Sequence, residues 1–286
     1  MQTAIVGGLF ALFFALPVLA QRLSPEEYQA AVAQLADANP EVRREAAELL
    51  GRKGWRQRRE FAPQLRRMLR RDPDWRVRAS SGRSLGRLSV RAAVPDLVAA
   101  LRDPQVEVRV VAAAALWRLP DPAAVPALVR VLNDSDPAAR QWAALALGVI
   151  RDPRATEPLA ALLNDAEDSV RMDAVRSLGR IGDPNALRPL TSFVSNGERR
   201  MEERLEGINS IASLESPDKV NTLVRLLGAE ESAIRLRAVA ALEQVGDALA
   251  IPALRRLRQR ENASGRRAID QALRAIRERM AATPSR

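Results

Sequence analysis

The sequence contains no cysteine and no histidine among its 286 residues. The absence of cysteine excludes disulfides, thiolate nucleophiles and thiolate metal sites. The absence of histidine excludes imidazole acid–base catalysis, Ser-His-Asp triads and the imidazole ligands on which most zinc and non-haem iron sites depend. A carboxylate-only magnesium or calcium site stays open, but no aspartate-rich loop has the required spacing. We therefore predict no catalytic residue, no cofactor and no metal site, and we expect a protein that is not an enzyme.

Aromatic residues and lysine are also scarce. Aromatics make up 3% of the chain, whereas alanine, leucine and valine are abundant, and such small aliphatic side chains suit thin layers of packed helices. Lys53 and Lys219 are the only lysines among 45 basic residues. This dominance of arginine indicates a GC-rich coding bias as much as selection for phosphate binding. The formal net charge of the chain is +10.

One arginine recurs along the chain at a nearly constant interval, which is longer only before the second and the sixth occurrence. We call these residues the marker arginines: Arg43, Arg78, Arg109, Arg140, Arg171, Arg204, Arg235 and Arg266. A small or apolar residue follows each marker by three positions, and leucine or isoleucine follows by seven. A fixed period of this size is typical of a solenoid, which usually presents a surface for partners.

Residues 103–134 illustrate one repeat unit. Asp103-Pro104 favours a helix start, because aspartate caps free amides and proline is tolerated in the first turn. Apolar residues from Val108 to Leu119 follow helical spacing, and the prolines at 120 and 122 end that helix. A second short helix is predicted over residues 125–132. Glycine stands between the two helices in some other units, at Gly182 and Gly246, and predicts a helix C-cap there. The pattern predicts two antiparallel helices per unit and no strand.

The pattern V-R-x-x-A-x-x-x-L-G, followed by D-P-x-A-x-P-x-L, resembles the PBS (phycobilisome) lyase HEAT-like repeats. Residues 170–190 match it most fully, and residues 108–128 and 234–254 match it well. The resemblance implies an all-α fold, a right-handed α-solenoid (an armadillo/HEAT-like superhelix) of about eight helix pairs. We divide the chain into a signal peptide (1–20), an N-terminal helical cap (21–37), the solenoid (38–280) and a disordered tail (281–286).

HEAT repeats serve scaffolds, adaptors and a few enzymes, so the resemblance favours a fold more strongly than a function. Phycobilisome-lyase relatives attach or isomerise bilins, but no residue here marks that role. Deoxyhypusine hydroxylase binds di-iron through His-Glu pairs, which a chain without histidine cannot form. Helical-repeat DNA glycosylases use tryptophan, aspartate and arginine around a lesion, and their repeat type differs from this one.

The N-terminal segment 3–20 is uncharged and apolar, and Val18-Leu19-Ala20 offers a cleavage site before Gln21. These features are typical of a secretory signal peptide, although the segment before the apolar run has no lysine or arginine. An uncleaved membrane anchor is the alternative, because 18 apolar residues reach the lower limit for spanning a bilayer. Pro17 and the cleavage-site residues favour a cleaved signal. We expect a periplasmic or secreted protein.

The marker arginines have two interpretations. They form either a ladder that binds anions or an internal ladder in which each arginine pairs with an aspartate of its own or an adjacent turn. Recurrence in nearly every unit favours the internal ladder, because bidentate arginine–carboxylate pairs suit a fixed geometry between layers. The predicted structural ladder consists of Arg78, Arg109, Arg140, Arg171, Arg235, Asp121, Asp152, Asp183 and Asp247.

Basic residues concentrate at both ends of the array. Residues 52–71 hold nine basic residues against Glu60, and residues 255–279 hold nine arginines against three acidic residues. Solvated capping units are one interpretation, and binding to an acidic protein or an anionic envelope surface is another. Nucleic acid is the third, with Trp55 and Trp75 as stacking groups, but the expected export of the protein argues against it.

Partner-binding residues are predicted on the second helices, which line the concave side in related solenoids. One equivalent position in successive units falls on the exposed side of those helices and becomes basic toward the C-terminus: Ala99, Arg130, Ala161, Ser192, Arg225 and Arg256. Trp117 and Trp142 lie at helical spacing among alanines, and we interpret them as layer-filling or partly exposed residues. The candidate binding residues are Arg130, Arg225, Arg256, Arg66, Arg67 and Arg70.

The repeat breaks at residues 196–203, where two residues are added and Asn196-Gly197 interrupts the pattern. Insertions in a solenoid fall in loops, so a kink or a binding feature is expected there. The sequence as a whole predicts an exported, non-catalytic HEAT-repeat scaffold whose arginines select an acidic protein partner. A subunit associated with an enzyme and a nucleic-acid binder remain the alternatives.

Overall fold

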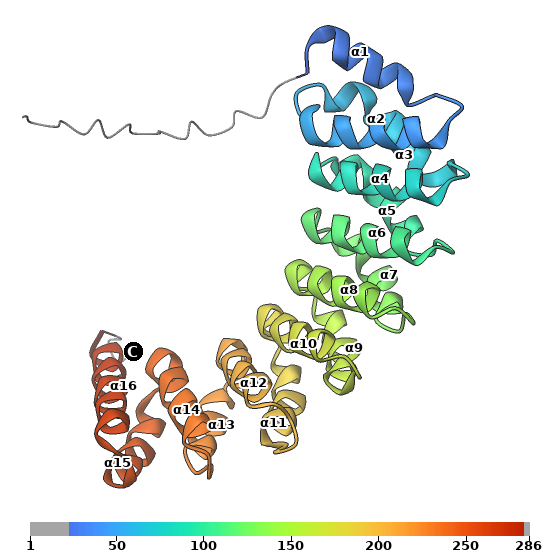
Figure 1. Ribbon diagram of the computed structural model, residues 1–286. Helices are drawn as coiled ribbons and strands as arrows, with labels where there is room; N and C mark the ends of the chain where they lie inside the picture. The colour runs from blue at the N-terminus through green and yellow to red at the C-terminus, as the bar shows by residue number, and fades with distance from the viewer. Residues whose placement is uncertain (1–22, 283–286) are drawn as a thin grey trace, which may run out of the picture.

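The computed structural model describes residues 23–282, which form an all-α solenoid of sixteen α-helices (Figure 1). The helix α1 (Pro25–Gln34) precedes seven helix pairs, and α16 (Ala263–Ala282) ends the array. The first helices of the pairs are α2 (Pro40–Lys53), α4 (Trp75–Arg87), α6 (Val106–Arg118), α8 (Pro137–Ile150), α10 (Asp168–Ile181), α12 (Met201–Ser213) and α14 (Ser232–Val245). The second helices are α3 (Arg58–Arg71), α5 (Val94–Ala100), α7 (Val125–Val131), α9 (Thr156–Ala161), α11 (Leu187–Ser195), α13 (Lys219–Leu226) and α15 (Ile251–Arg260).

Short 3-10 helices precede most second helices, and one follows α9. They are η1 (Arg91–Ala93), η2 (Pro122–Ala124), η3 (Pro153–Ala155), η4 (Leu162–Asn164), η5 (Pro184–Ala186) and η6 (Ala248–Ala250). Helix α1 lies in the segment assigned to the cap, and the division of the chain as a whole stays a prediction. α16, however, extends to Ala282, into the segment assigned to a disordered tail. The expected signal peptide lies outside the described residues. None of the helices within residues 23–282 is both long and apolar enough to cross a membrane.

The core runs through the array as stacked layers of aliphatic side chains. The leucine or isoleucine seven positions after each marker arginine is buried in every layer, and Leu85, Leu116, Leu147 and Leu178 have no exposed surface. The small residue three positions after the marker is also buried, as Ala112 and Ala143 show. Each layer therefore covers the apolar face of the next, which is how a solenoid builds one continuous core.

The array is curved, and its first helices line the concave side. In Figure 1, α8, α10, α12 and α14 lie inside the bend, and α9, α11, α13 and α15 lie outside it. Small residues let the first helices approach closely: a Cβ on Gly148 would lie 2.5 Å from Ser177 Oγ, and one on Gly86 would lie 2.9 Å from Ala115 Cβ. Helices packed through such residues lie closer together, so the row of first helices is shorter than the row of second helices. The arrangement is the reverse of the expectation that the second helices face inward.

Glycine is the C-cap residue at both predicted positions, and the two caps differ in conformation. Gly182 follows α10 with φ +79°, a left-handed conformation that glycine adopts without steric cost. Gly246 follows α14 in an extended conformation, with φ −66° and ψ 154°. Arg151 occupies the position of Gly182 one unit earlier and has φ 59°, so a residue with a side chain adopts the left-handed cap there.

Candidate interaction surface

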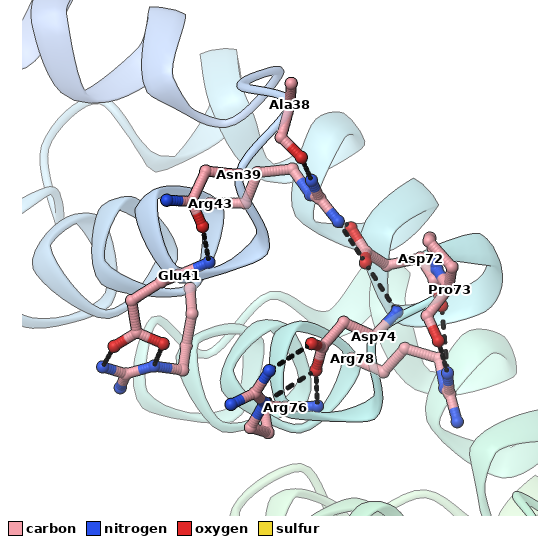
Figure 2. Close-up of polar contacts among 10 residues, drawn as sticks. Ala38, Asn39, Glu41, Arg43, Asp72, Pro73, Asp74, Arg76 and Arg78 are labelled. Carbon is pink, nitrogen blue, oxygen red and sulfur yellow. Dashed lines mark hydrogen bonds and ion pairs between the residues drawn. The ribbon is translucent and has the colours of Figure 1, made fainter.

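The marker arginines join successive layers at the turns that precede the first helices. Figure 2 shows Arg43 reaching from α2 to the carboxylate of Asp72, in the turn before α4. The same guanidinium donates from Nη1 to the carbonyl oxygens of Asp37 and Ala38, in its own turn. Three further units repeat this geometry, and the four nitrogen–oxygen distances are 2.6 to 2.8 Å: Arg43–Asp72, Arg78–Asp103, Arg109–Asp134 and Arg140–Asp165.

The carboxylate in each of these pairs also closes the turn before the next helix, because it accepts a hydrogen bond from the backbone N–H two residues later. Asp134 Oδ1 accepts a hydrogen bond from the backbone N–H of Asp136, and Asp165 Oδ1 accepts one from Glu167. The hydrogen bonds from the Arg109 and Arg140 guanidinium groups hold the pKa values of Asp134 and Asp165 below their ordinary range. One acidic residue therefore stabilises both the turn before a first helix and a contact between layers.

The structure pairs the marker arginines with a different set of aspartates from the one that the sequence analysis expects. Asp121, Asp152, Asp183 and Asp247 each accept a hydrogen bond from the backbone N–H two residues later, at the start of a 3-10 helix. They follow the marker by twelve positions, about 18 Å along a helix, so they lie at its opposite end. Asp103, Asp134 and Asp165 also recur, at one constant interval after successive markers, and this spacing was the signal for the observed partners.

The ladder becomes irregular beyond Arg140. Arg171 contacts Glu203 of α12, at 2.9 Å, because Asn196 occupies the position of the earlier aspartates. Arg204 donates to the Val194 carbonyl and to Glu231, and Arg235 pairs with Glu261 at 2.6 Å. The last marker, Arg266, lies in α16, after which no further layer follows within the described residues.

The irregular segment 196–203 spans the turn between α11 and α12 and continues into the first turn of α12, and its residues contact the preceding layer. The Arg199 guanidinium donates to Asn164 Oδ1 at 2.7 Å and lies 5.3 Å from the centre of the Phe193 ring. Arg200 pairs with Asp168 at 2.7 Å. These contacts give the insertion a structural role, and the expected binding feature stays a prediction.

The six arginines predicted to bind a partner all lie on second helices, which are on the convex side of the bend. Arg66 and Arg70 on α3 share the carboxylate of Asp96 on α5, at 2.5 and 2.6 Å, and Asp96 is only 5% exposed. Both therefore join α3 to α5. Arg225 donates to Thr222 of its own helix. The remaining three are exposed: Arg67, Arg130 and Arg256.

A hollow of about 1230 Å³ is an open groove between the second helices α11 and α13. Arg188 and Arg225 line it, but so does Asp218, together with the hydroxyl groups of Thr191 and Ser192. Of the predicted binding residues, this groove includes Arg225 alone. Its mixed charge favours no class of partner.

The concave side carries a basic and apolar surface over α4, α6 and α8. A hollow of about 170 Å³ there is lined by Val111, Ala114 and Trp142, with three exposed arginines: Arg83, Arg87 and Arg118. No carboxylate lines this hollow. We call it the tryptophan notch.

Two tryptophans meet beside this notch. Trp117 of α6 and Trp142 of α8 contact each other edge to face, with ring centres 5.9 Å apart and planes at 65°. Both are partly exposed, which is one of the two interpretations made from the sequence. The Arg118 guanidinium lies 5.7 Å from the centre of the Trp117 ring, close enough for a cation–π contact. Aromatic rings beside arginines are typical of the residues that dominate binding at protein interfaces.

The acidic groups on either side of this surface are neutralised within the chain. Glu48 of α2 lies 2.9 Å from Arg44 and accepts a hydrogen bond from Ser80. On α10, Asp173 accepts hydrogen bonds from Gln141 and Arg176. The positive charge of the tryptophan notch therefore has no acidic counterpart in its lining, and Arg87 and Arg118 are available to an external anion.

The described residues contain no cluster of three or more acidic side chains placed to hold a metal ion. The expectation of no catalytic residue and no cofactor stays a prediction.

The comparisons with known proteins concern the repeats. The family model for HEAT repeats matches residues 28–107, 94–172, 140–202 and 199–274. No curated protein matches the sequence. Among solved structures, the complex of CpcE and CpcF of phycocyanin lyase from Nostoc sp. PCC7120 has a TM-score of 0.51 and 23% identity, over 84% of this chain and 96% of that chain. YibA from Escherichia coli has a TM-score of 0.58 and 20% identity, over 76% and 81%. At these identities the likeness shows the fold alone.

Proposed function

Because the chain belongs to the HEAT-repeat family, we propose that it is an exported, non-catalytic scaffold that mediates protein–protein interaction. The observation that carries the proposal is the concave surface of α4, α6 and α8. Three exposed arginines surround a half-buried apolar floor there, with no carboxylate in the lining. The partner that fits is a protein with an acidic segment.

The mechanism is geometric. The stacked layers hold the arginines of α4 and α6 at fixed positions, so a partner meets a preorganised surface and little entropy is lost in ordering it. Positive charge on a concave surface also speeds the encounter with an acidic partner and discriminates against basic ones. The arginine–aspartate ladder contributes rigidity to this surface and lies away from it, at the turns before the first helices.

The exported location is part of the proposal and depends on residues 3–20, which are uncharged and apolar and end in a cleavage-site pattern. A fusion of a periplasmically active reporter to the C-terminus tests it. Activity of the reporter outside the cytoplasm supports export. A reporter that is active only in the cytoplasm overturns this part of the proposal and leaves the scaffold function to be judged by binding.

A subunit associated with an enzyme is the second candidate, and its support is the similarity in fold to the complex of CpcE and CpcF of phycocyanin lyase. In that case the partner is another chain of the enzyme, and the concave surface remains the site of contact. Nucleic acid is a weaker candidate, as is an anionic envelope surface. The described basic residues do concentrate on α3, but Asp96 engages two of its arginines.

The binding experiment uses the full-length chain, with a tag, to capture partners from envelope extracts at low and high salt. The test variant is Arg87→Glu combined with Arg118→Glu. The matched control reverses the same charge on the convex side, at Arg130 and Arg256. One protein, recovered by the wild type and the control but lost with the test variant, supports the proposal. Capture of nucleic acid alone, or loss of the partner only with the convex variant, overturns it.

A further inference from the structure

The tryptophan notch deepens the proposed function and rests on it. We infer that the notch binds one apolar side chain of an acidic segment, with carboxylates on both sides of that residue held by Arg87 and Arg118. The partner thus presents an apolar side chain with carboxylates on both sides, and it docks on α4, α6 and α8. Four observations support it.

First, the two tryptophans depart from the repeat. Where α8 has Trp142, the other first helices of the array have Glu45, Ser80, Val111, Asp173, Glu206 and Arg237. Where α6 has Trp117, they have Gly51, Gly86, Gly148, Gly179, Ala212 and Glu243. The fully buried core of these layers consists of other residues, such as Leu116 and Leu147, and the two tryptophans are partly buried and pack against it. Since the other layers pack without an aromatic residue at either position, the repeat itself does not require one.

Second, the size of the notch suits a single side chain. Its volume is about 170 Å³. An apolar cavity of about 150 Å³ accommodates benzene, so this space holds one aliphatic group of the size of leucine. The space exists because the backbones of α4 and α6 come close together at Gly86 and Ala115, whose Cβ positions would be 2.9 Å apart. The small side chain of Ala114 leaves this space open beside Trp142, which also lines the notch.

Third, the charge around the notch is not balanced within the chain. Arg87 makes no ion pair among residues 23–282. Arg83 is 3.9 Å from Glu48, a carboxylate that already contacts Arg44 and Ser80. Guanidinium groups bind carboxylates through two parallel hydrogen bonds, and a partly enclosed apolar floor strengthens such contacts.

Fourth, the repeat sets the spacing. Arg87 and Arg118 occupy equivalent positions in adjacent layers, nine positions after their markers. Packed helices lie about 8–10 Å apart, and an extended chain rises about 3.3 Å per residue. Two carboxylates about three residues apart therefore reach both arginines, and the residue between them lies over the notch.

The test measures fluorescence anisotropy of a labelled nonapeptide with a central leucine between two pairs of glutamates, against a matched peptide with alanine in the centre. Full-length wild type is expected to bind the leucine peptide about tenfold more tightly than the alanine peptide, because a buried leucine loses more apolar surface to the protein. Arg87→Glu with Arg118→Glu is expected to weaken both peptides at least about tenfold. Arg130→Glu, on the convex side, is the control and is expected to leave both unchanged.

Two variants of the notch test the apolar part separately. Trp142→Ala removes the wall, and Ala114→Leu fills the space while keeping a residue that favours helix. Both are expected to abolish the preference for leucine and to retain the dependence on glutamate. Since Ala114→Leu removes no packing, it gives an answer even where Trp142→Ala unfolds the chain. Equal binding of the two peptides by wild type, or no binding of either, overturns the inference.

The outcomes also separate this inference from the proposed function. One outcome is a captured protein partner that depends on Arg87 and Arg118, with no preference for the leucine peptide. That outcome overturns the inference about the notch and leaves the proposed scaffold function supported. An oligothymidylate of twelve nucleotides serves as a competitor. If it displaces the leucine peptide at equal concentration, the surface binds polyanions in general, and both proposals are overturned.

Discussion

The Arg109 guanidinium donates two hydrogen bonds to the Asp134 carboxylate, at 2.6 and 2.7 Å, and thereby joins the turn before α6 to the turn before α8. The same carboxylate accepts a hydrogen bond from the backbone N–H of Asp136, the N-cap residue of α8. The two groups are largely buried, so their interaction is stronger than that of an exposed ion pair. Asp134 therefore contributes to the stability of two layers.

Asp134→Asn is expected to lower the free energy of unfolding by about 2 kcal/mol at pH 7, because a hydrogen-bonded charge pair is lost. Asparagine retains the hydrogen bond of the turn, as Asn196 does by accepting from the backbone N–H of Glu198. Urea unfolding measures the change. Asp121→Asn is the matched control: Asp121 caps a 3-10 helix and is expected to change stability by less than about 0.5 kcal/mol. Equal effects at both positions would contradict the ladder.

The stability of the ladder is expected to depend on pH in a defined direction. Arg109 holds the pKa of Asp134 in the folded chain below its ordinary value, so the unfolded chain takes up the proton first. The contribution of the ion pair is therefore complete above about pH 5 and falls as the pH passes below about 4. The difference in unfolding free energy between wild type and Asp134→Asn is expected to shrink between pH 5 and pH 2. A difference that grows in acid would contradict the assignment.

Gly148→Ala is expected to destabilise the chain by about 1–2 kcal/mol, although alanine favours helix. The added Cβ would lie 2.5 Å from Ser177 Oγ and 2.9 Å from Ser177 Cα, so α8 and α10 must move apart. Thermal and urea unfolding measure the effect. Gly197→Ala is the control, since a Cβ there meets nothing within 4 Å. A stabilised Gly148→Ala variant would show that this close approach is not needed.

Arg151→Gly is expected to stabilise the chain by about 0.5 kcal/mol, because the residue is left-handed, at φ 59°, and glycine relieves that strain at some cost in unfolded-state entropy. The complementary change, Gly182→Ala at φ +79°, is expected to destabilise by about 1 kcal/mol. Shifts of the urea midpoint in opposite directions support the equivalence of the two caps. Destabilisation by both changes would show that the Arg151 side chain contributes more than its backbone strain costs.

Asp96→Asn is expected to destabilise the chain by about 1–2 kcal/mol, because Arg66 and Arg70 lose the carboxylate that joins α3 to α5. Arg67→Glu, at the exposed neighbour of Arg66, is expected to change stability by less than about 0.5 kcal/mol. The two results together separate the structural arginines of α3 from its solvated ones. An unchanged free energy of unfolding in Asp96→Asn would show that Arg66 and Arg70 do not stabilise the contact between α3 and α5.

The fold was predictable because the repeat determines which segments form helices and which residues are buried. A leucine seven positions after each marker is needed in every layer, so its period alone indicates the core, and Leu116 and Leu147 are fully buried. The internal role of the marker arginines was also predictable from recurrence. Their partners were not, because each unit offers two aspartates that recur with the marker, as Asp121 and Asp134 do after Arg109. The two aspartates are distinguished only by the end of the first helix at which each one lies, because the marker arginine stands at the start of that helix.

The candidate site was less predictable, for a reason of geometry. Which helices line the concave side depends on which layer packs more closely, and that follows from small residues meeting across layers, as Gly86 does with Ala115. The recurrent glycine eight positions after a marker was a signal for this, at Gly51, Gly86, Gly148 and Gly179. The pairing of Trp117 with Trp142 joins residues from two layers, and helical spacing within one layer does not reveal it.

In the regular half of the array, each joint between layers takes its arginine from one unit and its aspartate from the start of the next, as Arg78–Asp103 and Arg109–Asp134 do. Such a unit begins with an aspartate that pairs with the preceding unit, and it contains a marker arginine that pairs with the following unit. Gain or loss of a whole unit leaves every remaining joint with the same chemistry. The regular half of the array is thus free to change length by duplication or deletion, whereas the half beyond Arg171, whose joints differ from one another, is tied to its present neighbours.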